Sequence, residues 1–446
     1  MGVHGYERRL LFAIVAIALA LRALLAVESP TPYGYVFDFY HEGVQRMVAL
    51  GRIPVASDCW QCYHPPLFYV AGLPFYAIGK YLMGGPGGMA DRALPVLTLL
   101  SLGAALVTAF YGDRLLRHYR VSGHERLIGV ALLLAFPCLF ISSWGIEADI
   151  VLTAIMSAFI YYCVRFFELP GWRAAIGLGV LAGLACATKY HGLLAPAIIG
   201  VLATIRIVTG PGRFSIARYA AVALIIAALV GGWKYVDNVK RYGTPLFANG
   251  SAQQGFAVSG RPSFASQYDF LSLRLNDLFR LTRGEVPPGH LTDLPFYRSV
   301  WTSLHAMAWG DMSFFSDPSR HGFFRQPYPR KRIAPWLASA VLVLGLFPNA
   351  LALCGAAITA RRREYWPLLV TGLLAWAAYV AWFLAQESWA LKTKYLLFLL
   401  PIYVVYVIEA WRWIANRSRM AGVAVVSILG LLLILTNLYL LDFAWS

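Results

Sequence analysis

Charged side chains are scarce in this chain of 446 residues: Asp, Glu, Lys and Arg together make up only 13% of it. Soluble domains carry about 25% charged residues, and hydrophobic residues here reach 59%. The composition therefore excludes an ordinary soluble domain and predicts a multi-span membrane protein.

Acidic residues are scarcer than basic ones, with 22 Asp and Glu against 38 Lys and Arg and a formal net charge of +16. An excess of this sign also occurs in nucleic-acid-binding proteins. Here, however, the Arg and Lys residues lie in short clusters between apolar runs, where the positive-inside rule explains them. We therefore predict no nucleic-acid partner.

Cysteine is also rare, with six in the chain, and only Cys59 and Cys62 lie in a polar segment, "CWQC". A disulfide between these two is the favoured interpretation if the segment faces an oxidising compartment. Half of a zinc site or a redox pair is less favoured, because no second Cys pair or thioredoxin-like context appears. The other four lie in apolar runs, where a thiol acts as a small hydrophobe: Cys138, Cys163, Cys186 and Cys354.

Several signals of other protein classes are missing. The chain has no internal repeat, and no small-residue cleavage site follows its first apolar run, so we interpret that run as a retained span. The segment "GGPGG" at 84–88 lacks the Lys-Ser/Thr ending of a phosphate-binding loop and is interpreted as a turn.

Long apolar runs dominate the rest of the chain. A run of about 20 residues crosses a hydrocarbon core ~30 Å thick. Eleven runs meet this need: 10–27, 92–113, 126–143, 149–167, 174–189, 191–208, 217–236, 335–358, 365–386, 395–411 and 420–441. The predicted fold is an all-α polytopic membrane protein with about eleven transmembrane helices.

One further apolar stretch, at 66–83, determines the side on which every later loop lies. If it crossed the membrane, later clusters such as Arg361, Arg362 and Arg363 would face outside, against the positive-inside rule. Lys80 and Pro74 also leave it short of a full span. We therefore predict that it lies at or dips into the outer surface, with the N-terminus inside.

This topology places two long segments outside. The first, 28–91, belongs to an N-terminal transmembrane module at 1–236. The second, 237–334, is polar and aromatic and is long enough for a small subdomain over the membrane face. The remaining residues, 335–446, form the C-terminal transmembrane helices.

The first external segment contains "FDFYHEGVQRMVALG" at 37–51, with apolar residues at helical spacing and Asp38, Glu42 and Gln45 on another face. The pattern predicts an amphipathic helix in the interface, with carboxylates just above the lipid. From spacing alone, the favoured interpretation is that Asp38 caps this helix and Glu42 is a solvated surface residue.

The order of motifs along the chain shifts the interpretation of Asp38 and Glu42 toward a functional role. After the first span come "FDFYHEG", "YHPPLFY", "DRALPVLTLLSLGAALVTAFYGDRLL", "SSWGIEADIVLTAIMSAFIYYCVRFF", "GLACATKYHGLL", "VKRYGTPLFANG" and "KTKYLLFLLP". Together these resemble the C-type, membrane-embedded glycosyltransferases, in particular the protein O-mannosyltransferase and aminoarabinose (lipid A) transferase branch. The resemblance covers most of the chain.

The resemblance implies an enzyme that transfers a sugar from a polyprenyl-phosphate carrier to a hydroxyl acceptor on the outer side of the inner (plasma) membrane. It assigns the role of catalytic base to Asp38. Many members have adjacent Asp and Glu, whereas Phe39 follows Asp38 here and the glutamate comes a turn later, at Glu42. Which carboxylate is the base therefore stays open.

The resemblance also implies a substrate-binding set at the outer surface. Glu147 and Asp149 are candidates, with a solvated loop charge as the alternative. Lys189 either snorkels to the interface or binds the donor phosphate. Lys392 and Lys394 allow the same two interpretations, and the family position favours phosphate contact.

Divalent-metal binding stays open as well. His41 and His64, together with Asp38 and Glu42, offer imidazole and carboxylate ligands that suit zinc or manganese. Their spacing is not diagnostic, and an ordinary hydrogen-bonded histidine is favoured. We expect no certain cofactor and include His64 among the candidate substrate-binding residues.

The main rival function is a transporter or flippase of lipid-linked or anionic substrates. Transporters tend to have repeats and ionisable residues near the membrane midplane. The spans here are almost free of charge apart from Arg22, and the acidic residues gather at the predicted outer ends. The pattern favours the enzyme, and a lipid-linked glycan ligase or polymerase would have the same architecture.

Overall fold

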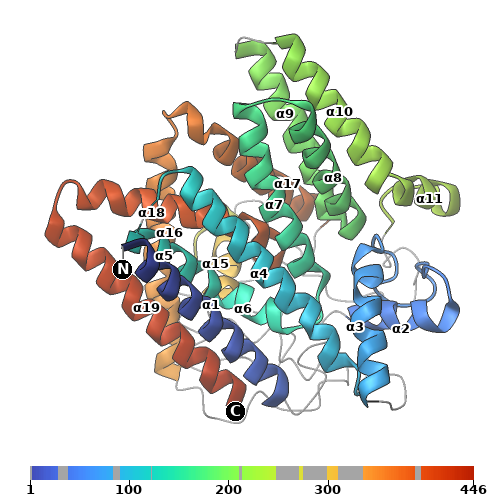
Figure 1. The fold of residues 1–446 in the computed structure, drawn as a ribbon, viewed down its shortest axis with the longest axis horizontal. Coiled ribbons are helices and arrows are strands. Elements are labelled where there is room, and N and C mark those ends of the chain that lie inside the picture. The colour runs from blue at the N-terminus through green and yellow to red at the C-terminus, as the bar shows by residue number, and fades with distance from the viewer. Residues whose placement is uncertain are drawn as a thin grey trace.

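A computed structural model describes residues 3–28, 39–83, 91–121, 123–209, 213–247, 271–274, 299–309, 335–386 and 393–445. Within these residues every regular element is a helix, and no strand is present (Figure 1). The predicted all-α fold is confirmed. Most of the predicted external subdomain at 237–334 lies outside the described residues, so it stays a prediction.

The N-terminal module contains twelve described helices, of which η2 is a short 3₁₀ helix. They are α1 (Val3–Glu28), α2 (Tyr40–Leu50), α3 (Leu67–Met83), α4 (Leu94–His118), α5 (Gly123–Leu134), α6 (Pro137–Trp144), α7 (Ala148–Glu168), α8 (Trp172–Thr188), η2 (Tyr190–Leu193), α9 (Leu194–Thr209), α10 (Arg213–Gly231) and α11 (Trp233–Tyr242).

The rest of the described chain contains α15, which lies in the predicted external loop, and the C-terminal helices. Their bounds are α15 (Val300–Trp309), α16 (Pro335–Thr359), η6 (Arg363–Tyr365), α17 (Trp366–Gln386), η7 (Thr393–Leu399), α18 (Leu400–Ala415) and α19 (Arg419–Trp445).

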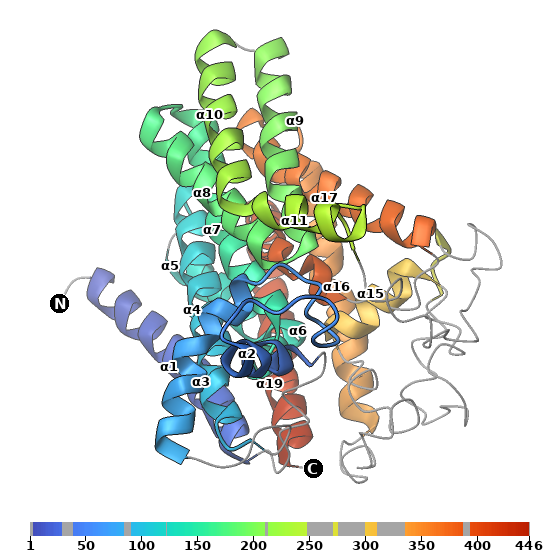
Figure 2. The same cartoon turned by 90° about the vertical axis from the view of Figure 1, so that its right-hand side faces the viewer.

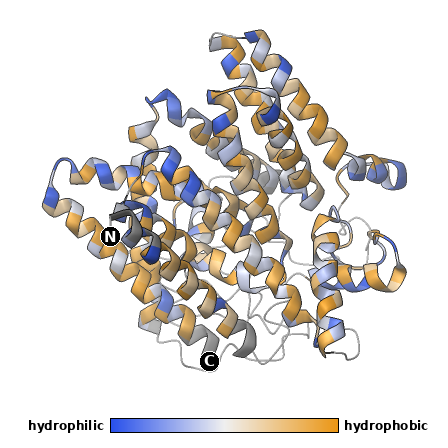
Figure 3. Ribbon diagram, in the orientation of Figure 1, coloured by the Kyte–Doolittle hydropathy of each residue, from blue (hydrophilic) through white to orange (hydrophobic). Residues whose placement is uncertain are grey.

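Eight of the described helices are long and apolar enough to cross a membrane: α4, α7, α9 with η2, α10, α16, α17 with η6, α18 with η7, and α19. The bent pair of α5 and α6 is a ninth where it is counted as one broken span and not as a re-entrant loop. α8 is a shorter apolar helix, and α1 contains the predicted span at 10–27. This set makes the chain a multi-pass membrane protein and is compatible with eleven spans. Figure 3 shows apolar residues along these long helices.

The predicted span at 126–143 is not one straight helix. α5 ends at Leu134, α6 begins at Pro137, and the two axes are bent by 55°. Proline cannot donate a backbone hydrogen bond inside a helix, which explains the break. Buried Arg22 of α1 donates to the Leu134 carbonyl oxygen (2.6 Å) and to the Ser143 hydroxyl (2.6 Å), so its side chain satisfies polar groups near the break.

α7 and α18 form the centre of the bundle. Within the apolar windows of these two spans, 78% and 72% of the residues are buried, whereas the other six long spans have 28 to 44% buried. A helix that is apolar all round is stable either inside protein or against lipid. The central position of α7 matters because the candidate site lies at its N-terminal end.

α8 and α10 approach closely through a small-xxx-small motif, Gly179 and Gly183. A Cβ at Gly179 would lie 2.5 Å from the Ala223 carbonyl oxygen, and one at Gly183 would lie 2.5 Å from the Val230 Cβ. Such glycines let two helices pack in a bilayer. The packing fixes the C-terminal end of α8, where Lys189 follows.

The first external segment contains the predicted helix as α2, which begins at Tyr40 rather than at residue 37. Its N-cap is Phe39, which has a left-handed backbone (φ 58°) and makes no side-chain cap hydrogen bond. Tyr40, His41 and Val44 in the N-terminal half of α2 are buried, while Val48 in its C-terminal half is exposed. α2 packs on α3 (Figure 2).

Candidate active site

Four ionisable side chains meet where the ends of three helical segments come together. Lys189 lies 2.8 and 2.7 Å from the two carboxylate oxygens of Asp149. The Lys394 ammonium lies 3.2 Å from Glu147 and 3.7 Å from Asp149. We name Glu147, Asp149, Lys189 and Lys394 the charge cluster.

The local backbone explains why these side chains converge. Glu147 is the extended N-cap of α7 and Asp149 lies in its first turn, where the positive end of the helix dipole favours carboxylates. Lys189 ends α8 with an extended backbone (φ −160°) before η2 begins. Lys394 is the second residue of η7. The cluster therefore depends on helix ends, where the chain changes direction.

All four side chains of the charge cluster are buried, with exposed fractions of 2, 2, 2 and 5% in chain order. Neither lysine reaches the surface by snorkelling, and neither acid is a solvated loop charge. Buried ion pairs lose hydration that their attraction only partly restores, so they are weak evidence for stability. Two such pairs at one point make this cluster the leading candidate for a functional site.

Aromatic rings enclose the Lys189 ammonium, which lies 5.2 Å from the centre of the Tyr40 ring and 5.0 Å from that of Tyr395. His64 stacks on Tyr40 (5.9 Å) and meets Tyr190 edge-on (5.6 Å). We name Tyr40, His64, Tyr190 and Tyr395 the aromatic wall. It joins α2 to the charge cluster and brings the predicted residue His64 next to it.

The tyrosines of the aromatic wall were not among the predicted site residues. A usable signal existed, because the tripeptide Thr-Lys-Tyr occurs twice, at 188–190 and at 393–395. In both copies the lysine enters the charge cluster and the following tyrosine enters the aromatic wall.

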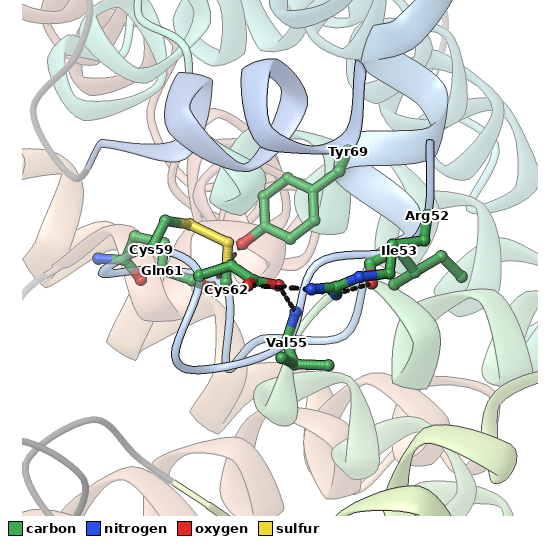
Figure 4. Close-up of a disulfide and its surroundings, with 8 residues drawn as sticks. Arg52, Ile53, Val55, Cys59, Gln61, Cys62 and Tyr69 are labelled. Carbon is green, nitrogen blue, oxygen red and sulfur yellow. Dashed lines mark hydrogen bonds and ion pairs between the residues drawn. A yellow bond between two sulfur atoms is a disulfide. The ribbon is translucent and has the colours of Figure 1, made fainter. Parts of the chain in front are cut away.

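The loop between α2 and α3 carries His64 and is tied at several points (Figure 4). Cys59 and Cys62 form a disulfide, as the favoured interpretation predicted. The Tyr69 hydroxyl of α3 donates to the Gln61 carbonyl oxygen (2.5 Å). These ties hold the loop against α3 and so fix one side of the aromatic wall.

A second tie within the loop is the ion pair of Arg52 and Asp58 (2.8 Å), whose carboxylate also accepts from the Val55 backbone N–H (2.7 Å). The Arg52 hydrogen bond lowers the pKa of Asp58. On the far side, the Tyr190 hydroxyl lies 3.0 Å from the Tyr63 carbonyl oxygen and 2.8 Å from that of Phe247, and it accepts from the Asn238 amide (3.0 Å). The loop is therefore connected to η2 and α11 as well.

Replacing both disulfide cysteines, Cys59→Ser with Cys62→Ser, should lower stability by about 2 kcal/mol, because even a short cross-linked loop constrains the unfolded chain. Thermal unfolding of the purified protein with and without reductant measures this, and Cys354→Ser is the matched control. We expect reductant to lower the midpoint of the parent and of the control but not of the double variant. An equal effect of reductant on all three would contradict a stabilising disulfide.

Of the remaining predicted site residues, Glu42 belongs to neither the charge cluster nor the aromatic wall. Asp38 and Lys392 lie outside the described residues, so their roles stay predictions. Glu42 is half-buried and interacts with the Trp60 backbone and with Arg46. Burial raises the pKa of Glu42, while the Trp60 hydrogen bond and the Arg46 charge oppose this shift.

No group of three or more His, Cys, Asp or Glu side chains that could hold a metal ion is present among the described residues. The proposed ligand set includes Asp38, which lies outside them, so that set stays a prediction. His41 is buried, and neither ring nitrogen has a hydrogen-bond partner in the described part of the chain. Burial lowers the pKa of His41 to about 4, against the attraction of Asp91, so the ring is neutral at pH 7.

The helical bundle, with buried charges at its helix ends and α2 beside them, has counterparts of similar fold among solved membrane proteins. The chain is similar in fold to the oligosaccharyltransferase of Archaeoglobus fulgidus in complex with Zn and sulfate, with a TM-score of 0.54 over 97% of this chain and 14% sequence identity. The alignment covers 53% of the oligosaccharyltransferase, so this chain spans about half of that protein. The family resemblance is thereby confirmed at the level of the fold.

Two further solved structures are similar to this chain. AglB of A. fulgidus, in complex with an inhibitory peptide and a dolichol-phosphate, matches 97% of this chain and 56% of its own, with 13% identity and a TM-score of 0.53. ArnT from Cupriavidus metallidurans bound to undecaprenyl phosphate covers 90% of this chain and 76% of its own at 14% identity, but its TM-score of 0.39 supports no structural argument. No protein-family model matches the chain, and no curated protein does.

Proposed function

We propose that this protein is an integral-membrane glycosyltransferase, which moves a hexosyl or pentosyl group from a polyprenyl-phosphate donor to a hydroxyl acceptor on the outer face of the cytoplasmic membrane. The acceptor class is a glycolipid such as lipid A, another glycan or a protein. The observation that carries the proposal is the buried charge cluster, whose Lys189 lies against the Tyr40 ring of α2. Asp38 precedes Tyr40 by two residues in the sequence, so the proposed base is close in sequence to a residue that contacts the cluster.

The reaction is an inverting displacement. The Asp38 carboxylate accepts the proton of the acceptor hydroxyl while that oxygen forms a bond to the anomeric carbon. The bond from the anomeric carbon to the phosphate oxygen breaks, and polyprenyl phosphate leaves with the electron pair. A positioned base of this kind contributes about 10² to 10⁴-fold. Glu42 is the alternative base.

The charge cluster is suited to the leaving phosphate, which needs cationic stabilisation. Each lysine ammonium has three N–H donors. Asp149 accepts from Lys189 and Glu147 accepts from Lys394, so the two carboxylates hold the ammonium groups in place. In our proposal the two ammonium groups, together with Lys392, bind the phosphate oxygens.

The fold similarity supports a lipid-phosphate substrate, because AglB was observed in complex with a dolichol-phosphate and an inhibitory peptide. The aromatic wall supports a sugar subsite beside the phosphate, since aromatic rings offer flat apolar surfaces with polar edges. His64 belongs to that wall and is proposed to contact the sugar.

A direct test compares a deletion strain with its parent by mass spectrometry of lipid A, surface glycans and envelope glycoproteins. Loss of one sugar from one acceptor class, restored by the parent gene but not by the Asp38→Asn variant, supports the transferase. Unchanged glycoconjugates together with a changed distribution of a lipid-linked intermediate across the membrane would instead identify a transporter or flippase.

The proposed outer location of the site rests on α3 not crossing the bilayer. Single cysteines at exposed positions on α2 and in the last turn of α3, Val48→Cys and Tyr81→Cys, should both react with an impermeant thiol reagent from outside. Phe214→Cys, exposed at the start of α10, should react only after permeabilisation, as the positive-inside rule requires. If residues 48 and 81 reacted from opposite sides, α3 would cross and the topology would be wrong.

A further inference from the structure

A cavity of about 740 Å³ lies at the opposite end of α4 and α7 from the charge cluster. It is bounded by residues of α1, α4, α5 and α7. Arg165 of its rim follows Asp149 by 16 residues along α7, which corresponds to about 24 Å at 1.5 Å per residue. The cavity is therefore separate from the proposed transferase site.

The wall of the cavity is apolar and faces outward from the bundle. Leu11 and Val15 of α1 lie on one side, and Leu106 and Phe110 of α4 lie on the other. Leu106 and Phe110 are 37 and 51% exposed. Since α4 is one of the membrane-spanning helices, these surfaces are suited to hydrocarbon chains of the lipid.

The rim of the cavity is cationic. Asp113 is neutralised by Arg117 (2.7 Å) and Arg126 (3.2 Å). Arg114 and Arg165 are exposed and have no carboxylate partner among the described residues, so two positive charges stand uncompensated at the cavity mouth. Arg114 also lies over the Phe110 ring, 4.9 Å from its centre, which places its guanidinium at the boundary of the apolar wall.

We propose that this cavity binds one anionic glycerophospholipid from the membrane leaflet opposite the transferase site. The lipid phosphate is held by Arg114 and Arg165, and an acyl chain lies along Val15 and Leu106. Charge complementarity selects this occupant, because basic pockets between transmembrane helices bind anionic head groups. The volume of the cavity, about 740 Å³, falls in the range of about 300 to 1,000 Å³ that is usual for ligand sites.

Native mass spectrometry of the purified full-length protein with added phosphatidylglycerol or phosphatidylcholine tests the proposal. We expect selective retention of phosphatidylglycerol. Arg114→Gln with Arg165→Gln should lower the affinity for phosphatidylglycerol about 5-fold per arginine, hence about 25-fold together. The control pair, Arg213→Gln with Arg361→Gln, removes exposed arginines that do not line the cavity and should change retention less than 3-fold.

A second variant separates a lipid site from a bare anion site. Val15→Trp fills part of the cavity along its apolar wall and leaves every charge in place, so it should weaken phosphatidylglycerol retention. The Arg variants should keep the unfolding midpoint of the parent. If Val15→Trp has no effect and inorganic phosphate displaces the lipid, the cavity is an anion site and the proposal fails. Equal retention of phosphatidylcholine also overturns it. None of these measurements uses transfer activity, so they are independent of the proposed function.

Discussion

Asp38→Asn is expected to lower sugar transfer by two or more orders of magnitude while binding of the polyprenyl-phosphate donor stays largely intact. Asparagine keeps the size of the side chain but removes the carboxylate that accepts the proton. The N-cap of α2 is Phe39, so the substitution leaves the N-cap residue of the helix unchanged. Transfer rate and donor affinity are measured on the same purified preparation.

Glu42→Gln is the matched control, because Glu42 lies one turn along the same segment. Full activity in Asp38→Asn with loss in Glu42→Gln would move the base to Glu42. Full activity in both variants would refute a carboxylate base in this segment.

The pH profile gives an independent distinction between the two carboxylates. Burial raises the pKa of Glu42 above its ordinary value of 4.5. A base works only when deprotonated, so with Glu42 as the base the rate would fall, as pH decreases, already at a pH above 4.5. If Asp38 is the base, the acidic limb should be unchanged in Glu42→Gln.

The second large effect is expected at the charge cluster, where Lys189→Met alone should destabilise the protein by about 3 to 5 kcal/mol, because it leaves Asp149 with a buried and poorly compensated charge. Lys189→Met combined with Asp149→Leu removes both charges. Replacement of a buried pair by apolar residues of similar volume is often neutral or stabilising, and the pair of Glu147 and Lys394 (3.2 Å) stays intact. The double variant should therefore recover most of the lost stability.

Donor affinity separates a structural ion pair from a phosphate-binding one. If Lys189 binds the donor phosphate, the double variant should fold and yet bind polyprenyl-phosphate donor about 10-fold or more weakly, since a hydrogen bond to a charged group contributes about 1.5 to 3 kcal/mol. Lys189→Arg keeps the charge and should lose less. A double variant that folds and binds donor as well as the parent would restrict the pair to a structural role.

Several features of the protein were fixed by local sequence. The apolar runs predict the long helices, because a chain in hydrocarbon must satisfy its backbone hydrogen bonds within each segment. The disulfide of Cys59 and Cys62 joins residues only three apart, and α2 appears where period and composition predict it. In each case the determining interactions lie within a few residues of one another.

Only the tertiary structure determined how the charge cluster is paired. Asp149 and Lys189 are 40 residues apart and Glu147 and Lys394 are 247 apart, so no periodicity connects them. The sequence analysis selected all four residues, but it also allowed a solvated loop position for the acids and snorkelling to the interface for the lysines. Burial of these four side chains between α7, η2 and η7 excludes that role.

The aromatic wall and the break between α5 and α6 were likewise decided by tertiary contacts. Tyr40, Tyr190 and Tyr395 come from three distant segments, and each is an ordinary interfacial or core residue in its own sequence context. Hydropathy is a sum over single residues, so it shows only that a segment prefers lipid or the protein interior to water. Which side chains meet depends on how the helices pack against each other, and that packing is set by contacts between segments that the sequence does not place side by side.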